Sequence, residues 1–576
     1  MTCTHTAQPY DATPAQRCLR VPELVLLVCG ELRAAGCHKS LAAFAASCGV
    51  VCGPALDVLW EALDSLVPLM TILAYHSCHP PEEELYHPLQ ASSCHPAQKA
   101  SFRWPHEVPC RLPQEDSFYP PHQDLQGPDR MVSSAHISPE AWTRVYTYGR
   151  RVRAFTTPPR ASATHRAVLA LLAHHHSEGL SPTPFPFPRL HTLTFAYDRT
   201  HRAHLRLFLP PTLRTLRLDL RSAADQGFLL PALPALCPNL HALALAGIGR
   251  PALSALAERE RVGVGAWRGL ARVELPCALV GSLAHVARRT ALRALRVRLG
   301  AGERWVRARA SGFGALEELA VRTTCPARVG ELLGAMSSTP MALKVFTVGI
   351  EAGVEDGDGS GGEAKRYFAA LVGVLDLPAL QKFVYVEEKQ KGPQRACAWP
   401  EVTIDSILHY ARCPNMSHFE VGFWADMNDD NLAMLARAWP RLEYFSLGAN
   451  GDDSTSRATM ATLAALVPFA AHCPLLFHLQ IALDATHVPP SPPAPPKPRG
   501  VVPNICLRLS GSTMSGNVGT IGGYISAVFQ SRKKIGVYLD SRVDVSFDPR
   551  MAVLRRVRDL QQQQQHVTVS SSLELK

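Results

Sequence analysis

Residues 213–220 read LRTLRLDL, and this pattern of leucines decides the fold. It has the form L-x-x-L-x-L, and successive side chains of a β-strand point to opposite faces of its sheet. We therefore expect Leu216 and Leu218 to point into a core, and Arg217 and Asp219 to lie on the opposite, open face. One such stretch would mean little, because short apolar alternation is ambiguous. Its recurrence along the chain gives it weight.

Eleven copies of the pattern follow one another between residues 190 and 481, with starts 22 to 37 residues apart. They are LHTLTF (190), LRTLRL (213), LHALAL (240), LARVEL (270), LRALRV (292), LEELAV (316), LKVFTV (343), LQKFVY (380), MSHFEV (416), LEYFSL (442) and LFHLQI (476). Helical stretches such as DDNLAMLARAWP lie between the copies. No single strand–helix unit could bury its apolar face, so the units must stack into a solenoid. NICLRLSGS near residue 504 reads as a last, degenerate strand.

The predicted fold class is therefore α/β. A small amino-terminal helical domain precedes a solenoid of leucine-rich-repeat type, with a curved parallel sheet on the concave side and helices outside. The sequence ISPEAWTRVYTYGRRVRAF (137–155) has helical spacing through Phe155, and ATHRAVLALLAHHH predicts a second helix after it.

These patterns divide the chain into six parts. They are a disordered tail (1–19), a helical domain (20–75), a disordered Pro/His-rich linker (76–138), a helical cap (139–181), the solenoid (182–560, with loop insertions at 351–365 and 487–500) and a glutamine-containing disordered tail (561–576).

The opening helix, VPELVLLVCGEL at 21–32, first raises the question of a secretory signal or a membrane anchor. Glu23 and Glu31 interrupt its apolar run, and no stretch of about 20 apolar residues follows it. Pro22 suits the first turn of a helix, where its missing N–H has no intrahelical partner. We therefore expect the first helix of a small domain rather than an anchor.

The amino-acid composition indicates the cellular compartment of the protein and the kind of partner that it could bind. The 576 residues are 47% hydrophobic, enough for a large core, and the 16 cysteines form no dense framework. We expect reduced thiols and a location in the cytoplasm, the nucleus or both. The net charge is +10, but residues 140–330 hold 28 arginines, 11 acidic residues and no lysine.

This local excess of arginine has two interpretations. Codon bias on a solvated surface explains it without any function. Alternatively, if the strand register is right, a row of arginines crosses the open face and favours an acidic or phosphorylated protein substrate. Nucleic acid is the less favoured ligand, because the row has no interleaved aromatic residues. The candidate substrate-binding residues are Arg217, Arg272, Arg296, Arg298 and Arg322.

The chain lacks motifs for catalysis or for a cofactor. DGDGSG at 356–361 imitates an EF-hand loop, but its twelfth position is Tyr367 instead of a glutamate. The Cys/His-rich stretches at 76–80 and 93–96 lack the spacing of a zinc module. No phosphate loop, zincin motif or nucleophile elbow is present. We expect no enzyme activity, no metal and no cofactor.

The amino-terminal helices resemble an F-box. The segments that show the resemblance are VPELVLLVCGEL at 21–32 and SLAAFAASCGVVCGPALDVLWEAL at 40–63. The resemblance implies contact with the Skp adaptor of SCF ubiquitin ligases, and through it with a cullin. The residues to which it assigns this role are Pro22, Glu23, Leu24, Leu27, Val28 and Leu32 in the first helix, Leu41, Phe44 and Cys48 in the second, and Leu59 and Trp60 in the third. Val21 and the segment AGCH between the first two helices depart from the family pattern.

The rest of the chain resembles the leucine-rich-repeat F-box proteins that are abundant in mushroom-forming fungi. The segments that show the resemblance are AWTRVYTYGRRVRAF and the turns CPNL (237), CPNM (413) and CPLL (473). The resemblance implies a substrate-recognition subunit of an SCF-type ligase, with the adaptor on the F-box and a protein substrate on the solenoid. A ligase-independent repeat scaffold is the alternative, and retention of the Skp adaptor distinguishes the two.

Overall fold

The fold is a single parallel sheet built from one strand per repeat. In the described residues of a computed structural model, fifteen strands follow one another in the sheet in chain order, β1 to β15. The described residues are 13–78, 137–158, 162–196, 199–220, 229, 232–247, 269–275, 292–299, 313–325, 327–336, 340–351, 371, 374–388, 404–422, 427–448, 461–490, 504–509, 518–530 and 535–538. The predicted α/β class and its strand–helix solenoid are confirmed.

All eleven copies of the leucine pattern form strands, and the strands begin two residues after the leading apolar residue. They are β3 (Thr192–Ala196), β4 (Thr215–Asp219), β5 (Ala242–Ala246), β6 (Arg272–Leu275), β7 (Ala294–Leu299), β8 (Glu318–Thr323), β9 (Val345–Glu351), β10 (Lys382–Glu388), β11 (His418–Val421), β12 (Tyr444–Leu447) and β13 (His478–Gln480). The degenerate strand near 504 is β14 (Ile505–Arg508). Three short strands carry no copy of the pattern: β1 (Ala62–Leu63), β2 (Ala154–Thr156) and β15 (Ile535–Tyr538).

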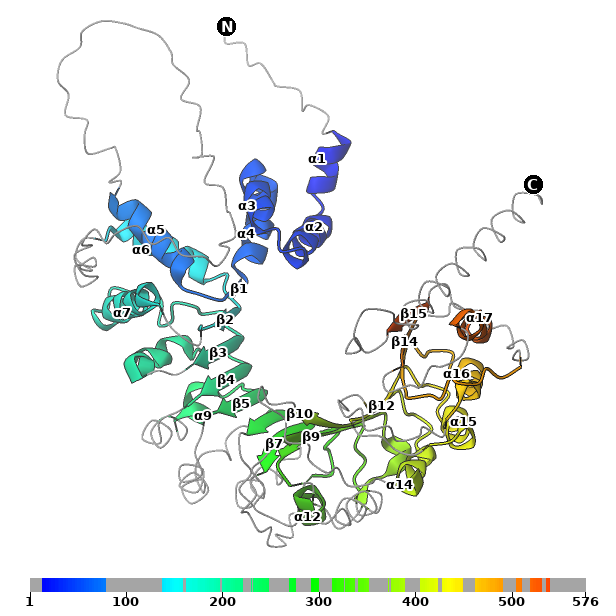
Figure 1. The fold of residues 1–576 in the computed structure, drawn as a ribbon. Coiled ribbons are helices and arrows are strands. Elements are labelled where there is room, and N and C mark those ends of the chain that lie inside the picture. The colour runs from blue at the N-terminus through cyan, green and yellow to red at the C-terminus, as the bar shows by residue number, and fades with distance from the viewer. Residues whose placement is uncertain are drawn as a thin grey trace, which may run out of the picture. The chain divides into compact units, whose positions relative to one another are not determined.

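The chain divides into two compact units, residues 1–213 and 214–576. The first unit holds β1 to β3 and most of the long helices (Figure 1). Its helices are α1 (Pro14–Leu19), α2 (Pro22–Ala34), α3 (His38–Ser47), α4 (Gly49–Trp60), α5 (Val67–Cys78), α6 (Pro139–Gly149), α7 (Ala163–Ser177) and the 3₁₀ helix η4 (Arg199–Phe208).

In the second unit, the described helices lie between β4 and β5, in each connection from β8 to β13, and between β14 and β15; α12 and α14 to α17 lie on one side of the sheet (Figure 1). The elements are α9 (Leu233–Leu236), α12 (Ala327–Met336), η6 (Leu377–Ala379), α14 (Ile404–Leu408), η7 (His409–Arg412), α15 (Asp429–Ala438), η8 (Leu463–Ala465), α16 (Leu466–His472) and α17 (Val518–Val528).

The core of the second unit contains an aromatic ladder on the helix side of the sheet. Phe383, Phe419 and Phe445 stack from strand to strand, with ring centroids 5.5 and 5.8 Å apart. Trp439, which follows α15, packs on Phe419 with ring centroids 4.9 Å apart, and Phe469 of α16 packs on Phe445 at 5.1 Å. Residues on either side of these phenylalanines in each strand therefore face the opposite, open side of the sheet.

The predicted sidedness of LRTLRLDL is confirmed. Leu216 and Leu218 are buried, Arg217 is exposed and Asp219 is half-buried. Alternation within one strand was sufficient for this prediction, because the side-chain period of a strand is two residues wherever the strand pairs.

The cysteines of the three Cys-Pro turns are core residues. Cys237, Cys413 and Cys473 are all buried. Burial raises the pKa of the Cys237 and Cys413 thiols to about 12, so they stay protonated. The Cys473 thiol donates to the carbonyl oxygens of Ala436 and Trp439. No disulfide joins the described cysteines.

Two predicted boundaries near the amino terminus are wrong. Residues 14–19 form α1 instead of belonging to a disordered tail, and Leu19 packs on the core of the following helices. Helix α6 ends at Gly149, so Phe155 lies in β2 and not on a helix. The helix stops beside the carbonyl oxygen of Pro186, with which any side chain at position 149 would collide.

The predicted linker lies within one structural unit. β1 pairs with β2 through Ala62 and Ala154, and α5 packs against α6 and α7, so the segments before and after the linker belong together. The predicted boundary at 181/182 also falls inside this unit. Residues 79–136, the tail 561–576 and most of the two predicted loop insertions lie outside the described residues.

A buried histidine joins α6 to α7 in the first unit. The His175 ring stacks on Trp142 with centroids 3.9 Å apart, and its Nδ1 lies 3.0 Å from the Tyr146 hydroxyl. Burial lowers the pKa of His175, and the charges of His176 and His174 lower it further. The core therefore holds the neutral imidazole.

We expect acid to destabilise this unit through His175. Because its folded pKa lies below the unfolded value of about 6.5, the unfolded chain binds the proton first. Stability is fully present above that value and is lost as the pH falls through the folded pKa. Urea midpoints measured at pH 7, 6 and 5 should fall with pH, and less steeply in His175→Gln. Equal slopes in the two proteins would show that His175 does not titrate between the two states.

Candidate functional site

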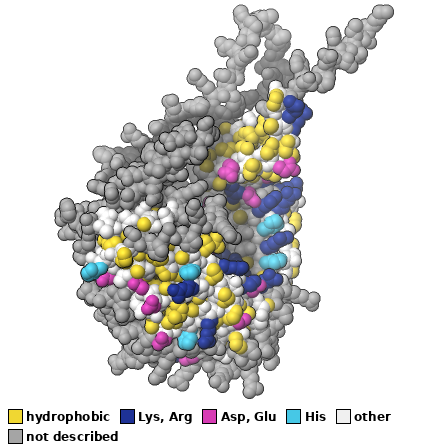
Figure 2. All heavy atoms as spheres, turned by 90° about the vertical axis from the view of Figure 1, so that its right-hand side faces the viewer, with side chains coloured by type: hydrophobic (Ala, Val, Ile, Leu, Met, Phe, Trp, Pro, Cys, Tyr) yellow, Lys and Arg dark blue, Asp and Glu magenta, His cyan; other side chains and the backbone are white. Residues whose placement is uncertain are grey.

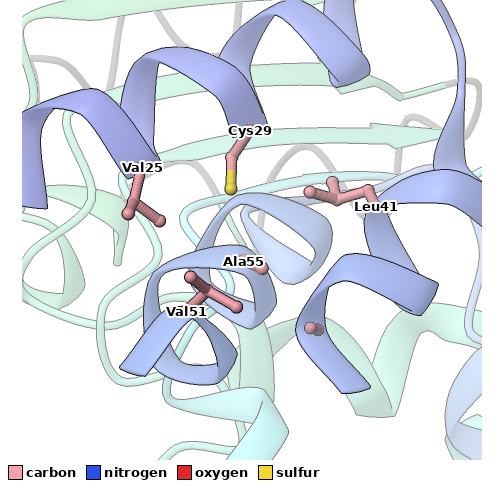
Figure 3. Close-up of a cluster of buried hydrophobic side chains, with 6 residues drawn as sticks. Val25, Cys29, Leu41, Val51 and Ala55 are labelled. Carbon is pink, nitrogen blue, oxygen red and sulfur yellow. The ribbon is translucent and has the colours of Figure 1, made fainter. Parts of the chain in front are cut away.

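The helical domain is built around a small core that orients α2. Val25 and Cys29 of α2 point toward Leu41 of α3 and toward Val51 and Ala55 of α4 (Figure 3). Val25 and Cys29 are four residues apart, so one narrow stripe of α2 faces the core. Pro22 occupies the first turn after the extended residue Val21, as predicted. Because the stripe is narrow, most of the helix surface faces outward.

The outward surface of α2 is apolar. Leu24, Leu27 and Val28 are 45%, 62% and 46% exposed, and Val21 and Leu26 are also exposed. We call these five residues the α2 surface. Exposed leucines scattered singly are normal, but several exposed apolar residues on one short helix are typical of an interaction site. The acidic Glu23 and Glu31 are exposed on the same helix.

The eleven predicted adaptor residues fall into three groups. Those exposed to solvent are Pro22, Glu23, Leu24, Leu27, Val28 and Cys48. Those packed on or in the core are Leu32, Leu41, Phe44 and Leu59. Trp60 stacks on Tyr148 of α6, with ring centroids 4.7 Å apart. Leu41 is fully buried, so it can support the surface but cannot touch a partner.

Sequence reasoning missed four exposed apolar residues in this domain. Val21 and Leu26 belong to the α2 surface, and Val50 of α4 and Val67 of α5 are also exposed. It also placed Leu32 with Leu24, Leu27 and Val28, whereas the structure packs Leu32 on the core. Helical spacing identifies residues that share a face, but it does not show which face the neighbouring helices cover.

Polar contacts hold the helical domain to the first strands of the same unit. Arg33 of α2 forms an ion pair with Glu61, which follows α4. Arg151, which follows α6, forms an ion pair with Asp57 of α4 and donates to the carbonyl oxygen of Gly53 at 3.0 Å. The helices that carry the α2 surface are therefore connected to the strands by side chains as well as by the chain itself.

The five predicted substrate-binding arginines are all exposed on the open face, but they do not form one row. Strand register puts Arg217 and Arg296 in one ladder row, Arg298 and Arg322 in a second and Arg272 in a third. Within the described residues shown in Figure 2, basic, acidic and histidine side chains are interspersed on the face drawn.

Two of these arginines already have acidic partners. Arg272 lies 3.6 Å from Glu318, and the Nε of Arg298 donates to Glu351 at 2.8 Å. The Arg272–Glu318 pair is exposed on both sides and contributes at most about 1 kcal/mol to stability, so a ligand could replace it, whereas the side chain of Glu351 is only 11% exposed. Both pairs reduce the net charge of the surface. Glu351 lies on β9, two strands away from Arg298 on β7.

A second polar surface, which sequence reasoning missed, lies on the open face of β11 to β14. The rings of His418, Tyr444 and His478 form a stack with centroid spacings of 4.2 and 4.3 Å and planes 5° apart. Each ring comes from the first residue of its strand, and the three are ladder partners. The residue two positions later in each strand forms the adjacent row, Glu420, Ser446, Gln480 and Arg508 of β14. We call these seven residues the stacked-ring surface.

The part of the chain that the structure describes contains neither a cluster of metal-ligating side chains nor a membrane-spanning helix. No group of three or more His, Cys, Asp or Glu side chains there is arranged to hold a metal ion. None of the described helices has the length and apolar character required to cross a membrane. The EF-hand-like loop at 356–361 and the Cys/His-rich stretch at 93–96 lie outside the described residues.

Comparison with known proteins does not assign a function to the α2 surface or to the open face of the sheet. No protein-family model matches the chain, and no curated protein is similar to it.

Proposed function

We propose that the chain is the substrate-recognition subunit of an SCF-type cullin ubiquitin ligase. Its F-box-like helical domain binds the Skp adaptor, and through it the cullin, while the open face of the strands binds a protein substrate. The chain itself performs no chemistry in this proposal. It raises the local concentration of substrate lysines near a ubiquitin-charged enzyme.

The observation that carries the proposal is the apolar α2 surface. Leu24, Leu27 and Val28 are about half exposed although apolar burial would be favourable, at about 25 cal/mol for each Å² removed from water. Helix α2 is also the segment whose sequence resembles the first helix of an F-box. Two independent features, one of sequence and one of exposure, thus support the same docking surface.

The open face of the sheet supports the substrate role. Strand-lined faces of solenoids offer long continuous surfaces on which polypeptides bind. In this chain the open face carries charged, aromatic and hydrogen-bonding side chains from β4 to β14. An acidic or phosphorylated substrate remains the preferred class.

The direct test is complex formation with a purified Skp adaptor. We expect the full chain to form a complex of one chain with one adaptor, detected by size-exclusion chromatography with light scattering. Addition of a cullin amino-terminal domain should then give a ternary complex. If the folded chain and the adaptor elute separately at micromolar concentrations, the proposal fails and a ligase-independent scaffold takes its place.

A further inference from the structure

The helical domain meets the rest of its unit at α4. Among the described elements, α2 and α3 pack on each other and on α4, and α4 contacts β1. Helix α4 ends at Trp60 and β1 begins at Ala62, so Glu61 is the single residue that connects them. The direction in which the α2 surface faces, relative to the strands of the same unit, is therefore set by how α4 is held.

Glu61 joins α2 to the first two strands. Its carbonyl oxygen accepts hydrogen bonds from the backbone N–H groups of Arg153 and Ala154, each at 2.8 Å. Its carboxylate forms an ion pair with Arg33, near the end of α2, and lies 4.0 Å from the guanidinium of Arg153. The backbone and the side chain of one residue thus connect α2 to β1 and β2.

The end of α6 and the residues after it contact one face of α4. Gly53, Asp57 and Trp60 are spaced by four and three residues, and residues at these spacings are neighbours on a helix surface. The Trp60 ring stacks on Tyr148 with centroids 4.7 Å apart and planes 23° apart. Arg151 forms an ion pair with Asp57 and donates to the carbonyl oxygen of Gly53 at 3.0 Å. We call Gly53, Asp57 and Trp60 the junction face of α4.

The junction face is separate from the core of the helical domain. Val51 and Ala55 are the α4 residues that point into that core (Figure 3). With 3.6 residues in each turn, the junction face lies on the opposite side of α4 from these two residues. The α2 surface belongs to another helix. A substitution in the junction face therefore leaves both the core and the α2 surface in place.

We infer that the junction face fixes the helical domain against α6, with Trp60 and Arg151 as positioning residues, so that a partner bound to the α2 surface is held in one orientation relative to β1, β2 and β3. The resemblance to an F-box assigns Trp60 to contact with the adaptor, whereas in the structure Tyr148 covers one face of its ring. That the partner is the Skp adaptor rests on the function proposed above. The fixed junction between α4 and α6 does not.

Hydrogen exchange in the full chain tests the junction without any partner. The double variant Trp60→Ala with Arg151→Gln removes both contacts, since a partly exposed ion pair contributes little by itself. Exchange in a β2 peptide that contains Arg153 and Ala154 should increase at least about tenfold, because these amides donate to Glu61. Exchange in α2 and α3 should stay at the wild-type level.

Two matched variants separate positioning from folding. Trp60→Phe keeps an aromatic ring opposite Tyr148 and should show wild-type exchange in β2. Arg150→Gln removes an exposed arginine one position before Arg151 and should behave as the wild type does. If exchange in the double variant increased through α2 and α3 as much as in β2, the inference would be overturned, because the junction face would then support the core of the helical domain.

Time-resolved fluorescence anisotropy measures whether a bound partner is held in one orientation. The probe is a purified Skp adaptor that carries a rigidly attached dye, bound to the full chain. The wild-type complex should show one slow rotation of the adaptor. In the double variant a faster component should appear with at least about a fifth of the amplitude, while the affinity for the adaptor stays within about twofold of wild type.

The outcomes separate this inference from the proposed function. If Trp60→Ala weakened adaptor binding at least about tenfold with wild-type exchange in β2, Trp60 would be an adaptor contact and its positioning role would be overturned. Identical rotation of the adaptor on the wild type and the double variant would overturn it as well. If the wild-type chain forms no adaptor complex, the ligase assignment fails, and the exchange measurement still decides whether the junction is fixed.

Discussion

Leu216→Asp should unfold the strands around β4, with the largest loss of stability of any change considered for this chain. Leu216 is 0% exposed and pairs with Leu243 of β5. An unpaired carboxylate at this position costs several kcal/mol, to which the lost apolar burial adds about 2 kcal/mol. A typical domain is stable by about 5–15 kcal/mol, so little stability would remain.

The measurement is urea unfolding followed by circular dichroism, together with hydrogen exchange of the β4 and β5 amides. Because each repeat contacts its neighbours, exchange should increase most in those strands. Arg217→Asp is the matched control, since it places the same residue one position later on the open face and should change stability by less than about 0.5 kcal/mol. A larger loss of stability for Arg217→Asp than for Leu216→Asp would show that Arg217, and not Leu216, faces the core.

Adaptor binding should be lost in the double variant Pro22→Ala with Leu24→Asp. The aspartate would bring a charge into an apolar interface, and central interface residues contribute 2 kcal/mol or more. We expect the affinity for the Skp adaptor to fall at least about hundredfold. The fold should remain intact, because Leu24 is 45% exposed and lies outside the α2 stripe that contacts the core.

Isothermal titration calorimetry measures this loss, with far-ultraviolet circular dichroism as the folding check. Leu180→Asp is the matched control, because Leu180 is 67% exposed in the same unit but is not part of the α2 surface. It should bind the adaptor as the wild type does. Near-wild-type affinity of the double variant for the adaptor would show that α2 is not the adaptor-binding site.

The candidate sites were only partly predictable. The resemblance predicts that α2 is an interaction helix, but in the structure Leu41, Phe44 and Leu59 pack in or on the core, while Val21 and Leu26 belong to the exposed α2 surface. Helical spacing gives the relative positions of side chains around one helix. Which of them remain exposed depends on where the neighbouring helices pack, and that information is not contained in the spacing.

The amino-acid sequence by itself determined the strands β3 to β13, because alternation with a period of two is a local property and each copy of the leucine pattern carries it in full. It also determined that Leu216 and Leu218 face the core. Only the tertiary structure decided the contacts between strands, such as β1 with β2 across a long intervening segment, or Arg298 with Glu351. The stack of His418, Tyr444 and His478 is of the same kind. Its rings are separated by 26 and 34 residues of different loops and helices, so their alignment depends on the register that packing imposes between repeats.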